Sequence, residues 1–279
     1  MSETMRARLL REAPAKLPDA GLRGHAAGLA ILAAAVGLYV FGVVALDVLP
    51  TRFIAGLFRL ADIVELMWPP NPGTWPRFLI YLDALGQTLA IAFVGTIAAA
   101  LLALPLGFLA ARNIVANRIV HFLARRGLDT VRSVDTLIWA LIWINVVGLG
   151  PFAGALAIAS ADLCALAKLM SEAIETADHR PVQGVLAAGG SRVEAIRFGI
   201  VPQILPVFAS QILYYIESNT RSATIIGIVG AGGIGLHLSE QIRVLEWQQA
   251  AFLILMVLVA VAIIDAISGV LRQRLIGRR

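Results

Sequence analysis

The 279-residue sequence has little charge and almost no cysteine. Charged residues make up 15% of the chain and hydrophobic residues 59%, whereas a soluble globular domain carries roughly 25% charge. This shortage argues against an ordinary soluble core and favours a protein that lies in a lipid bilayer. The single cysteine, Cys164, cannot form an intrachain disulfide, so the chain has no disulfide framework.

Lysine and histidine are also scarce, which limits the chemistry that the chain can perform. A phosphate-binding loop ends in Gly-Lys followed by Ser or Thr, but Lys16 and Lys168 are each followed by leucine. The four histidines match no metal-binding spacing such as H-E-x-x-H, and no G-x-S-x-G nucleophile motif occurs. We therefore expect that the chain is not an enzyme, holds no metal and binds no cofactor of its own.

The basic character of the chain does not indicate nucleic-acid binding. The calculated pI is about 10, but no run of basic residues is interleaved with aromatic residues of the kind that stack on bases. We expect no nucleic-acid partner, because the basic residues instead follow the pattern of a membrane protein.

Long uncharged runs predict an all-α integral membrane fold. About 20 apolar residues cross a bilayer as a helix, and several uncharged runs approach or exceed this length. One run contains Gly148-Leu149-Gly150-Pro151, a turn-forming cluster that we interpret as a break between two helices. A single kinked helix across this cluster is the alternative. The sequence thus predicts six transmembrane helices, over residues 26–47, 80–111, 134–149, 151–170, 200–220 and 248–271.

The distribution of basic residues supports six helices and orients them. Cytoplasmic segments of membrane proteins carry an excess of Lys and Arg. With both termini cytoplasmic, 18 of the 23 basic residues fall on the cytoplasmic side, and the five outside are Arg52, Arg59, Arg77, Arg221 and Arg243. Merging the two helices at the Gly-Pro cluster would place the last two basic segments on the wrong side of the membrane.

The predicted organisation follows from these helices. Residues 1–25 form a cytoplasmic N-terminal tail, 26–47 the first transmembrane helix, 48–79 an extracytoplasmic segment, 80–275 the core transmembrane domain and 276–279 a cytoplasmic C-terminal tail. The extracytoplasmic segment is unusually apolar, and the spacing of its hydrophobic residues between 53 and 66 suits an amphipathic helix lying in the membrane interface.

A glycine-rich segment, residues 230–235, satisfies the dinucleotide-binding pattern G-x-G-x-x-G. That pattern requires a β-α-β unit, but this segment lies between two predicted membrane helices, so we interpret it as a broken helix. Irregular backbone at membrane depth must be buried in protein or line an aqueous path. Gly230, Gly232 and Gly233 are therefore candidate residues of a translocation pathway.

Ionisable residues inside predicted membrane helices form a second candidate site, because a charge there is costly and usually faces the bundle interior. Asp162 and Asp265 fall inside such helices. Glu217 and Arg221 are four residues apart, so they can form an ion pair on one helix face. Two interpretations remain open: the pair is purely structural, or Arg221 offers its guanidinium to an oxyanion in transit.

The predicted cytoplasmic loop over residues 171–202 carries the most specific signal. It contains a helix that Pro181 restarts, a break at Gly189-Gly190, and a third helix that we expect to end near Pro202. Short helices of mixed charge joined by Gly and Pro suit a docking surface for a soluble partner. A solvated loop with no partner is the alternative.

This loop resembles the cytoplasmic motif E-A-A-x₃-G-x₉-I-x-L-P of binding-protein-dependent ABC permeases of the type I importer class. The matching positions are Gln183, Gly184 and Val185 for E-A-A, Gly189 for the central Gly, and Val201-Pro202 for Leu-Pro. Gln183 departs from the Glu of the motif, and Gly199 departs from its Ile.

Other segments resemble phosphonate-transport permeases in particular. They include Arg132-Ser-Val-Asp135 and the stretch from Glu217 through Asn219, Arg221 and Ser222 to Thr224. The Gly-Ala-Gly-Gly element at residues 230–233 also resembles methionine-importer permeases. The resemblance therefore adds Asn219 and Ser222 to Glu217, Arg221 and the three glycines as candidate residues of the pathway.

The resemblance implies a type I ABC importer permease fold in the inner (plasma) membrane of a bacterium. This chain would pair with a second copy or a paralogue above two cytoplasmic ATPase subunits, which bind ATP and Mg, and an extracytoplasmic substrate-binding protein would deliver the substrate. Residues Gln183 to Gly189 would be the coupling helix that contacts the ATPase. The implied substrate is phosphonate or a related oxyanion such as phosphite or a phosphate ester. A permease for methionine or another small solute, and a stand-alone channel or carrier, are the alternatives.

Overall fold

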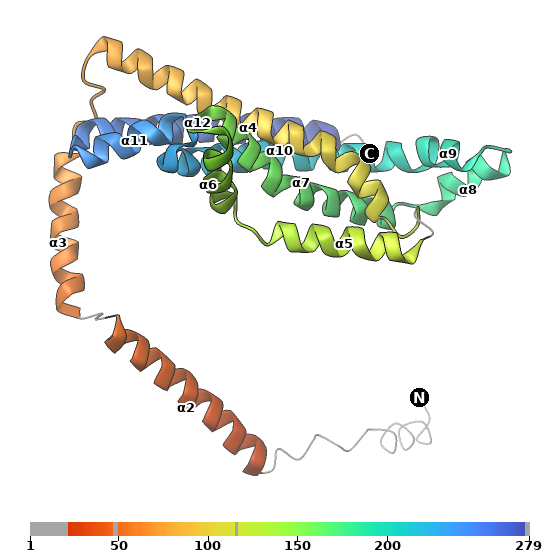
Figure 1. Cartoon of the computed structure of the whole chain (residues 1–279), viewed down its shortest axis with the longest axis horizontal. Helices are drawn as coiled ribbons and strands as arrows, with labels where there is room; N and C mark the ends of the chain where they lie inside the picture. The colour runs from red at the N-terminus through yellow and green to blue at the C-terminus, as the bar shows by residue number, and fades with distance from the viewer. Residues whose placement is uncertain (1–21, 47–49, 115–116, 277–279) are drawn as a thin grey trace, which may run out of the picture. The chain divides into compact units, whose positions relative to one another are not determined.

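The computed structural model describes residues 22–46, 50–114 and 117–276, and all regular structure in these ranges is helical (Figure 1). Within them, five helices are long and apolar enough to cross a membrane, which confirms the predicted all-α fold. The α-helices are α2 (Leu22–Ala45), α3 (Pro50–Leu66), α4 (Trp75–Ala110), α5 (Arg118–Arg132), α6 (Thr136–Val147), α7 (Pro151–Thr176), α8 (His179–Ala187), α9 (Arg192–Ala195), α10 (Val201–Ile226), α11 (Ile234–Arg243) and α12 (Trp247–Ile276). Two π-helical turns, η1 (Ile196–Ile200) and η2 (Gly227–Ala231), flank α10.

The chain divides into two compact units, residues 1–64 and 65–279. The first contains α2 and most of α3, and hydrophobic side chains are exposed along both helices. Helix α2 overlaps the predicted first transmembrane helix, and α3 confirms the helix predicted between residues 53 and 66. Its placement in the membrane interface stays a prediction. Of the predicted tails, residues 1–21 and 277–279 lie outside the described residues.

Helices α4 and α7 form the centre of the second unit, and small residues let them approach closely. A Cβ atom at Gly95 of α4 would lie 2.8 Å from Ile158 of α7, and one at Gly107 would lie 2.9 Å from Met170. Small residues are typical of helix contacts in membranes, because the bilayer supplies no hydrophobic force between helices and close packing must hold them. The contact also buries Ala92, Ala99, Ala103, Ala157 and Ala167.

The third predicted transmembrane helix, residues 134–149, is wrong as a single straight span. Helix α6 has 12 residues, which rise about 18 Å, less than the roughly 30 Å hydrocarbon core of a bilayer. Asp135 starts α6 afresh, because its carboxylate accepts a hydrogen bond from the Leu137 amide at 2.8 Å. Helix α5 meets α6 at 88°, and among the described residues these two helices pass the length and composition test for a sixth span only when they are taken together.

The predicted break between α6 and α7 is confirmed, and a second break packs against it. Trp143 donates a hydrogen bond to Ser160 at 2.9 Å across the turn, so α6 and α7 fold back on each other. The Gly150 amide donates to the Gly230 carbonyl at 3.1 Å. Gly230 has a φ of +107°, which ends the helical path at η2. The glycine-rich segment is thus a helix break buried in protein, as predicted.

Candidate functional site

The predicted coupling segment forms α8, a short helix at one end of the second unit (Figure 1). None of its residues is buried, and Gln183 and Gly184 are exposed, with Val185 half-buried. Asp178 caps the N-terminus of α8, since its carboxylate accepts a hydrogen bond from the Arg180 amide at 2.9 Å. The sequence therefore presents a fixed, exposed helix that a second protein can contact.

Gly189 ends α8 in a Schellman motif. The Gly189 amide donates to the Leu186 carbonyl at 3.0 Å, and the Gly190 amide donates to the Val185 carbonyl at 3.0 Å. Gly189 has a φ of +86°, a left-handed conformation that costs other residues about 1–2 kcal/mol. The break predicted at Gly189-Gly190 is confirmed, and it determines where the helix ends and how the chain leaves it.

Gln203 ties the coupling segment to the start of α10. Its Oε1 accepts a hydrogen bond from the Asp178 amide at 3.0 Å, while its Nε2 donates to the carbonyls of Asp178 at 3.0 Å and Gly199 at 2.6 Å. Gly199 lies so close to α8 that a Cβ atom there would be 2.9 Å from the Cα of Val182. A displacement of α8 must therefore move η1 and α10 with it.

A capping box starts the helical run that leads into α10. The Ser191 amide donates to Glu194 Oε2 at 2.7 Å, and the Glu194 amide donates to Ser191 Oγ at 3.3 Å. The hydrogen bonds from the Ser191 amide and then from its hydroxyl hold the pKa of Glu194 below its usual value. Both partners are exposed, so this box orders the turn after α8 without a buried core.

The prediction that the third loop helix ends near Pro202 is wrong. The helical run continues from Arg192 to Ala231 over 40 residues. Pro202 lies in the first turn of α10, where the missing amide of proline is tolerated. The π-helical turn Ile196–Ile200 directly precedes it and widens the helix at the point where a regular hydrogen bond is lost.

Two arginines engage Glu217 of α10. The Nη1 atom of Arg221 lies 3.3 Å from Glu217 Oε1, and the Nη2 atom of Arg272 on α12 lies 3.2 Å from Oε2. Arg272 also lies 3.8 Å from Asp265. The predicted Glu217–Arg221 ion pair is confirmed, and Arg272 is a partner that the spacing within one helix could not reveal.

The second arginine changes what Arg221 can do. The Glu217 side chain is 10% exposed, whereas that of Arg221 is 50% exposed. A buried carboxylate left without a partner is strongly destabilising, but Arg272 keeps Glu217 compensated when Arg221 turns away. The half-exposed guanidinium of Arg221 can therefore contact an anion without leaving an unpaired buried charge.

Asn219 is buried where α4, α7 and α10 meet. Its Nδ2 donates to Thr96 Oγ1 at 2.8 Å and also to the carboxylate of Asp162. Thr96 in turn donates to the Ala92 carbonyl at 2.7 Å. The buried triad of Thr96, Asp162 and Asn219 joins one side chain from each of three helices, so it fixes their register. The sequence singled out Asp162 as an ionisable residue in a membrane helix and Asn219 as a candidate pathway residue, but it did not indicate that the two form a hydrogen bond.

The remaining candidate pathway residues lie on or just after the second half of α10. Ser222 is half-buried, and its hydroxyl donates to the Ser218 carbonyl at 3.5 Å. Gly230, Gly232 and Gly233 are buried, and a Cβ atom at Gly232 would lie 2.8 Å from the Pro151 nitrogen. In this structure the glycines allow two chain breaks to pack together, and their contact with a substrate stays a prediction.

Thr88 of α4 holds the start of α11, a role that the sequence did not indicate. Its Oγ1 accepts a hydrogen bond from the Ile234 amide at 2.8 Å and donates to the Ala84 carbonyl at 3.0 Å. The first amides of a helix have no partner within that helix. A side chain from a distant helix therefore caps α11 and attaches the glycine break to α4.

Long apolar helices, ionisable and polar groups buried between them, and an exposed loop helix tied to α10 define a multi-pass membrane transport component. The chain belongs to the family of binding-protein-dependent transport system inner membrane components, whose model matches residues 103–277. It is the permease component of such a system.

Several relatives are similar over most of the chain. The putative phosphite transport system permease protein HtxC of Stutzerimonas stutzeri is 38% identical over 225 residues, which cover 81% of this chain and 79% of that protein. The phosphite transport system permease protein PtxC of the same organism is 35% identical, covering 80% of each. The phosphate-import permease protein PhnE of Mycolicibacterium smegmatis is 35% identical, covering 91% of this chain and 48% of that protein.

Solved structures show the same fold. A chain of the MetNI methionine ABC transporter in inward-facing conformations has a TM-score of 0.63 at 16% identity, covering 73% of this chain and 99% of that chain. A chain of an amino acid ABC transporter has a TM-score of 0.59 at 14% identity, covering 72% and 99%. These likenesses concern the fold and not the solute.

Proposed function

We propose that this chain is the membrane-spanning permease subunit of an ATP-driven importer for phosphonate or a related phosphorus oxyanion, such as phosphite or a phosphate ester. Relatives that are 35–38% identical over about four fifths of the chain are named as phosphite permeases. The observation that carries the proposal is the half-exposed Arg221 beside a Glu217 that keeps a second arginine. A guanidinium presents a planar set of donors that matches an oxyanion.

The proposed topology has six spans with both termini in the cytoplasm of a bacterium, so that α8 faces the cytoplasm. The bent pair of α5 and α6 supplies the sixth span. The excess of basic residues on one side of this arrangement supports the orientation. The proposed location is the inner membrane.

The proposed complex contains two cytoplasmic ATPase subunits, which bind ATP and Mg, and an extracytoplasmic substrate-binding protein. A second copy of this chain, or a paralogue, completes the pathway in the membrane. Hydrophobic side chains are exposed along α2, α4 and α12, more than a single chain in water would leave uncovered. Lipid and a second permease subunit are the proposed cover for these surfaces.

The contacts of α8 suggest how ATP hydrolysis reaches the solute. Closure of the ATPases would push on α8, and Gln203 would pass that movement to α10 through the Asp178 and Gly199 carbonyls. The run Arg192–Ala231 is helical over 40 residues, a length of about 60 Å. A long helix transmits a displacement at one end to Arg221 near the other, and the break at Gly230 absorbs the change of direction.

Gly189→Val is expected to lower ATP-dependent uptake about tenfold while ATP hydrolysis continues. The left-handed conformation costs a residue other than glycine about 1–2 kcal/mol, and about 1.4 kcal/mol corresponds to a tenfold change in the population of the native α8 conformation. Apart from Gly189 and its two chain neighbours, no atom of the described residues lies within 4 Å of a Cβ placed at Gly189, so the effect comes from its φ of +86° and not from a clash. Uptake and ATPase activity are measured in parallel, with membrane insertion checked by fractionation.

Gly189→Asn is the matched control, because asparagine tolerates the left-handed conformation better than a β-branched residue. It is expected to keep most of the uptake. Uptake at the wild-type rate in Gly189→Val would remove α8 from the coupling role.

The substrate class is tested by competition in cells that express the permease with its ATPase and binding protein. Uptake of labelled phosphonate should fall when unlabelled phosphonate or phosphite is added, and should not respond to methionine. Competition by methionine alone would replace the oxyanion proposal with a methionine-type importer.

A further inference from the structure

A small basic cavity lies beside α5, and its lining includes no residue of α8 and none of the group around Glu217. Its volume is about 170 Å³. The residues that line it are Arg112, His121, Phe122, Arg125, Arg126 and Asp129. Three arginines and a histidine face a single carboxylate there, so the lining carries more hydrogen-bond donors than acceptors.

His121 contributes a donor without a partner. The Nε atom of Arg112 donates to His121 Nε2 at 3.2 Å, so Nε2 is an acceptor and the ring proton is on Nδ1. The Nδ1 atom is buried and has no hydrogen-bond partner in the part of the chain that the structure describes. A buried donor without an acceptor is unfavourable, and an anion in the cavity would supply the missing acceptor.

The acidic groups near the cavity are engaged by other cations. Asp129 pairs with Lys168 of α7. Arg125 lies 3.2 Å from Glu175 and 3.9 Å from Glu172. The ion-pair partners of these carboxylates are therefore Lys168 and Arg125, and not Arg112 or Arg126.

Two guanidinium groups retain donors for a ligand. Across residues 22–46, 50–114 and 117–276, neither Arg112 nor Arg126 forms an ion pair. Arg126 lies over the ring of Phe122, 5.6 Å from its centre, which leaves the edges of its guanidinium available. Arg112 uses its Nε for His121 and keeps its two terminal nitrogens.

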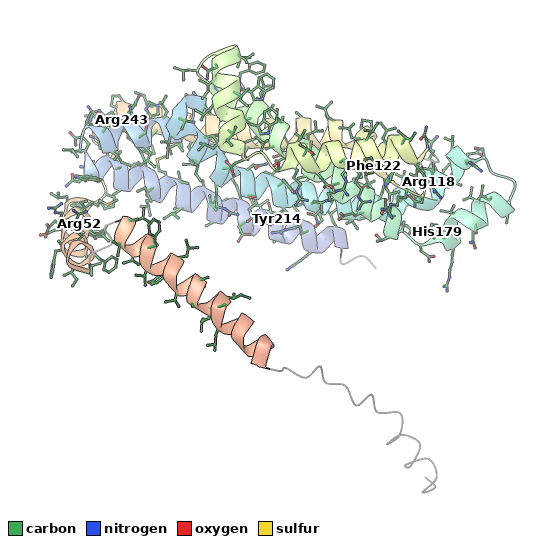
Figure 2. All side chains as sticks on the ribbon, turned by 60° about the horizontal axis from the view of Figure 1, so that its bottom comes forward. Arg52, Arg118, Phe122, His179, Tyr214 and Arg243 are labelled. Carbon is green, nitrogen blue, oxygen red and sulfur yellow. The ribbon has the colours of Figure 1, made fainter. Side chains whose placement is uncertain are left out.

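The cavity opens beside an apolar surface on α5. The side chains of Ile119, Phe122 and Leu123 are more than half exposed, and Figure 2 labels Arg118 and Phe122 on this helix. Exposed hydrophobic residues beside arginines are typical of the membrane–water interface, where the start of the bent α5–α6 span would lie. A ligand of this cavity can therefore come from solution or from the lipid headgroups.

We propose that this cavity binds a phosphate group through Arg112, Arg126 and the Nδ1–H of His121. Phosphate oxygens accept several hydrogen bonds at once, and arginine binds them in a planar, bidentate way. Both inorganic phosphate and the headgroup of an anionic phospholipid provide this chemistry. The bound group would join α5 to the end of α4 beside the Arg112–Glu175 contact, where the Arg112 amide donates to the carboxylate at 3.0 Å.

The test uses the full chain with the double variant Arg112→Gln/Arg126→Gln, which keeps polar side chains of similar length. One arm titrates inorganic phosphate into the detergent-purified chain by calorimetry. The other arm uses native mass spectrometry to count phosphatidylglycerol retained from nanodiscs, against phosphatidylcholine as the zwitterionic reference. Removing the two guanidinium groups is expected to weaken binding about tenfold or more.

Arg118→Gln is the matched control, since Arg118 is exposed on the same helix and does not line the cavity. It should bind like the wild type, and all three proteins should elute as one folded species. Phosphate binding lost only in the double variant supports the site with a soluble ligand, and phosphatidylglycerol retention lost only there supports it with a lipid ligand. No binding in either arm, or binding that the double variant leaves unchanged, overturns the proposal.

Discussion

Arg221→Ala is expected to lower ATP-dependent oxyanion uptake about tenfold or more while the amount of protein in the membrane stays near the wild-type level. The variant removes the half-exposed guanidinium that we assign to the oxyanion. It leaves Glu217 paired with Arg272 at 3.2 Å, so the buried carboxylate stays compensated. Uptake of labelled phosphonate, normalised to the amount of permease in membranes, measures the effect.

Two further variants sharpen this result. Arg221→Lys keeps the charge but loses the planar set of donors, so its uptake should fall between those of the wild type and Arg221→Ala. Arg243→Ala removes an exposed arginine of α11 and should leave uptake unchanged. If uptake and protein amount fell in parallel in Arg221→Ala, the Glu217–Arg221 pair would be purely structural.

Asn219→Leu is expected to destabilise the folded permease by about 2 kcal/mol, the scale for a buried polar group that loses its hydrogen-bond partner. Asn219 is the residue that donates a hydrogen bond to the Asp162 carboxylate in the described structure. The substitution would leave Asp162 facing an apolar side chain between three helices. Thermal unfolding in detergent, together with the protein amount in membranes, measures the loss.

The double variant Asp162→Leu/Asn219→Leu separates the cost of an unpaired carboxylate from the cost of changed packing. Replacing a complete buried polar pair by apolar residues is often nearly neutral, so this variant should recover much of the stability lost in Asn219→Leu. A double variant less stable than the single variant would show that packing volume, and not the unpaired carboxylate, causes the loss.

The long helices were predictable because the bilayer imposes a simple requirement on them. A run without charge must be about 20 residues long to cross, and α4, α7, α10 and α12 all overlap predicted spans. The glycine-rich break was predictable as well, since Gly230 adopts a φ that other residues avoid. The sequence predicted these features because each of them depends on residues that are close together in the chain.

Helix α5 was missed, although its sequence carries a signal. Residues 118–132 lie between the predicted spans 80–111 and 134–149, but hydrophobic residues recur through them at helical spacing and form an amphipathic helix. Because a long uncharged run follows these residues, the third span was predicted over residues 134–149 alone. As a result, the bend at Asp135 between α5 and α6 was not predicted.

Contacts between distant segments could not be predicted from one sequence. Gln203 meets Asp178 across 25 residues, Asn219 meets Asp162 across 57, and Thr88 meets Ile234 across 146. Gln203, Asn219 and Thr88 are polar residues within their own helices, and nothing local to them indicates these partners. Their roles arise only when the fold brings two segments together, so the helices of the loop over residues 171–202 could be predicted from its sequence but their attachment to α10 could not.

The most direct test of the whole account is phosphonate uptake by proteoliposomes that contain the permease with or without its ATPase subunits. Uptake is expected only when the ATPase, ATP and the binding protein are all present, and the permease alone should not hydrolyse ATP. Movement of phosphonate down its gradient through the permease alone, or ATP hydrolysis by it, would contradict the account.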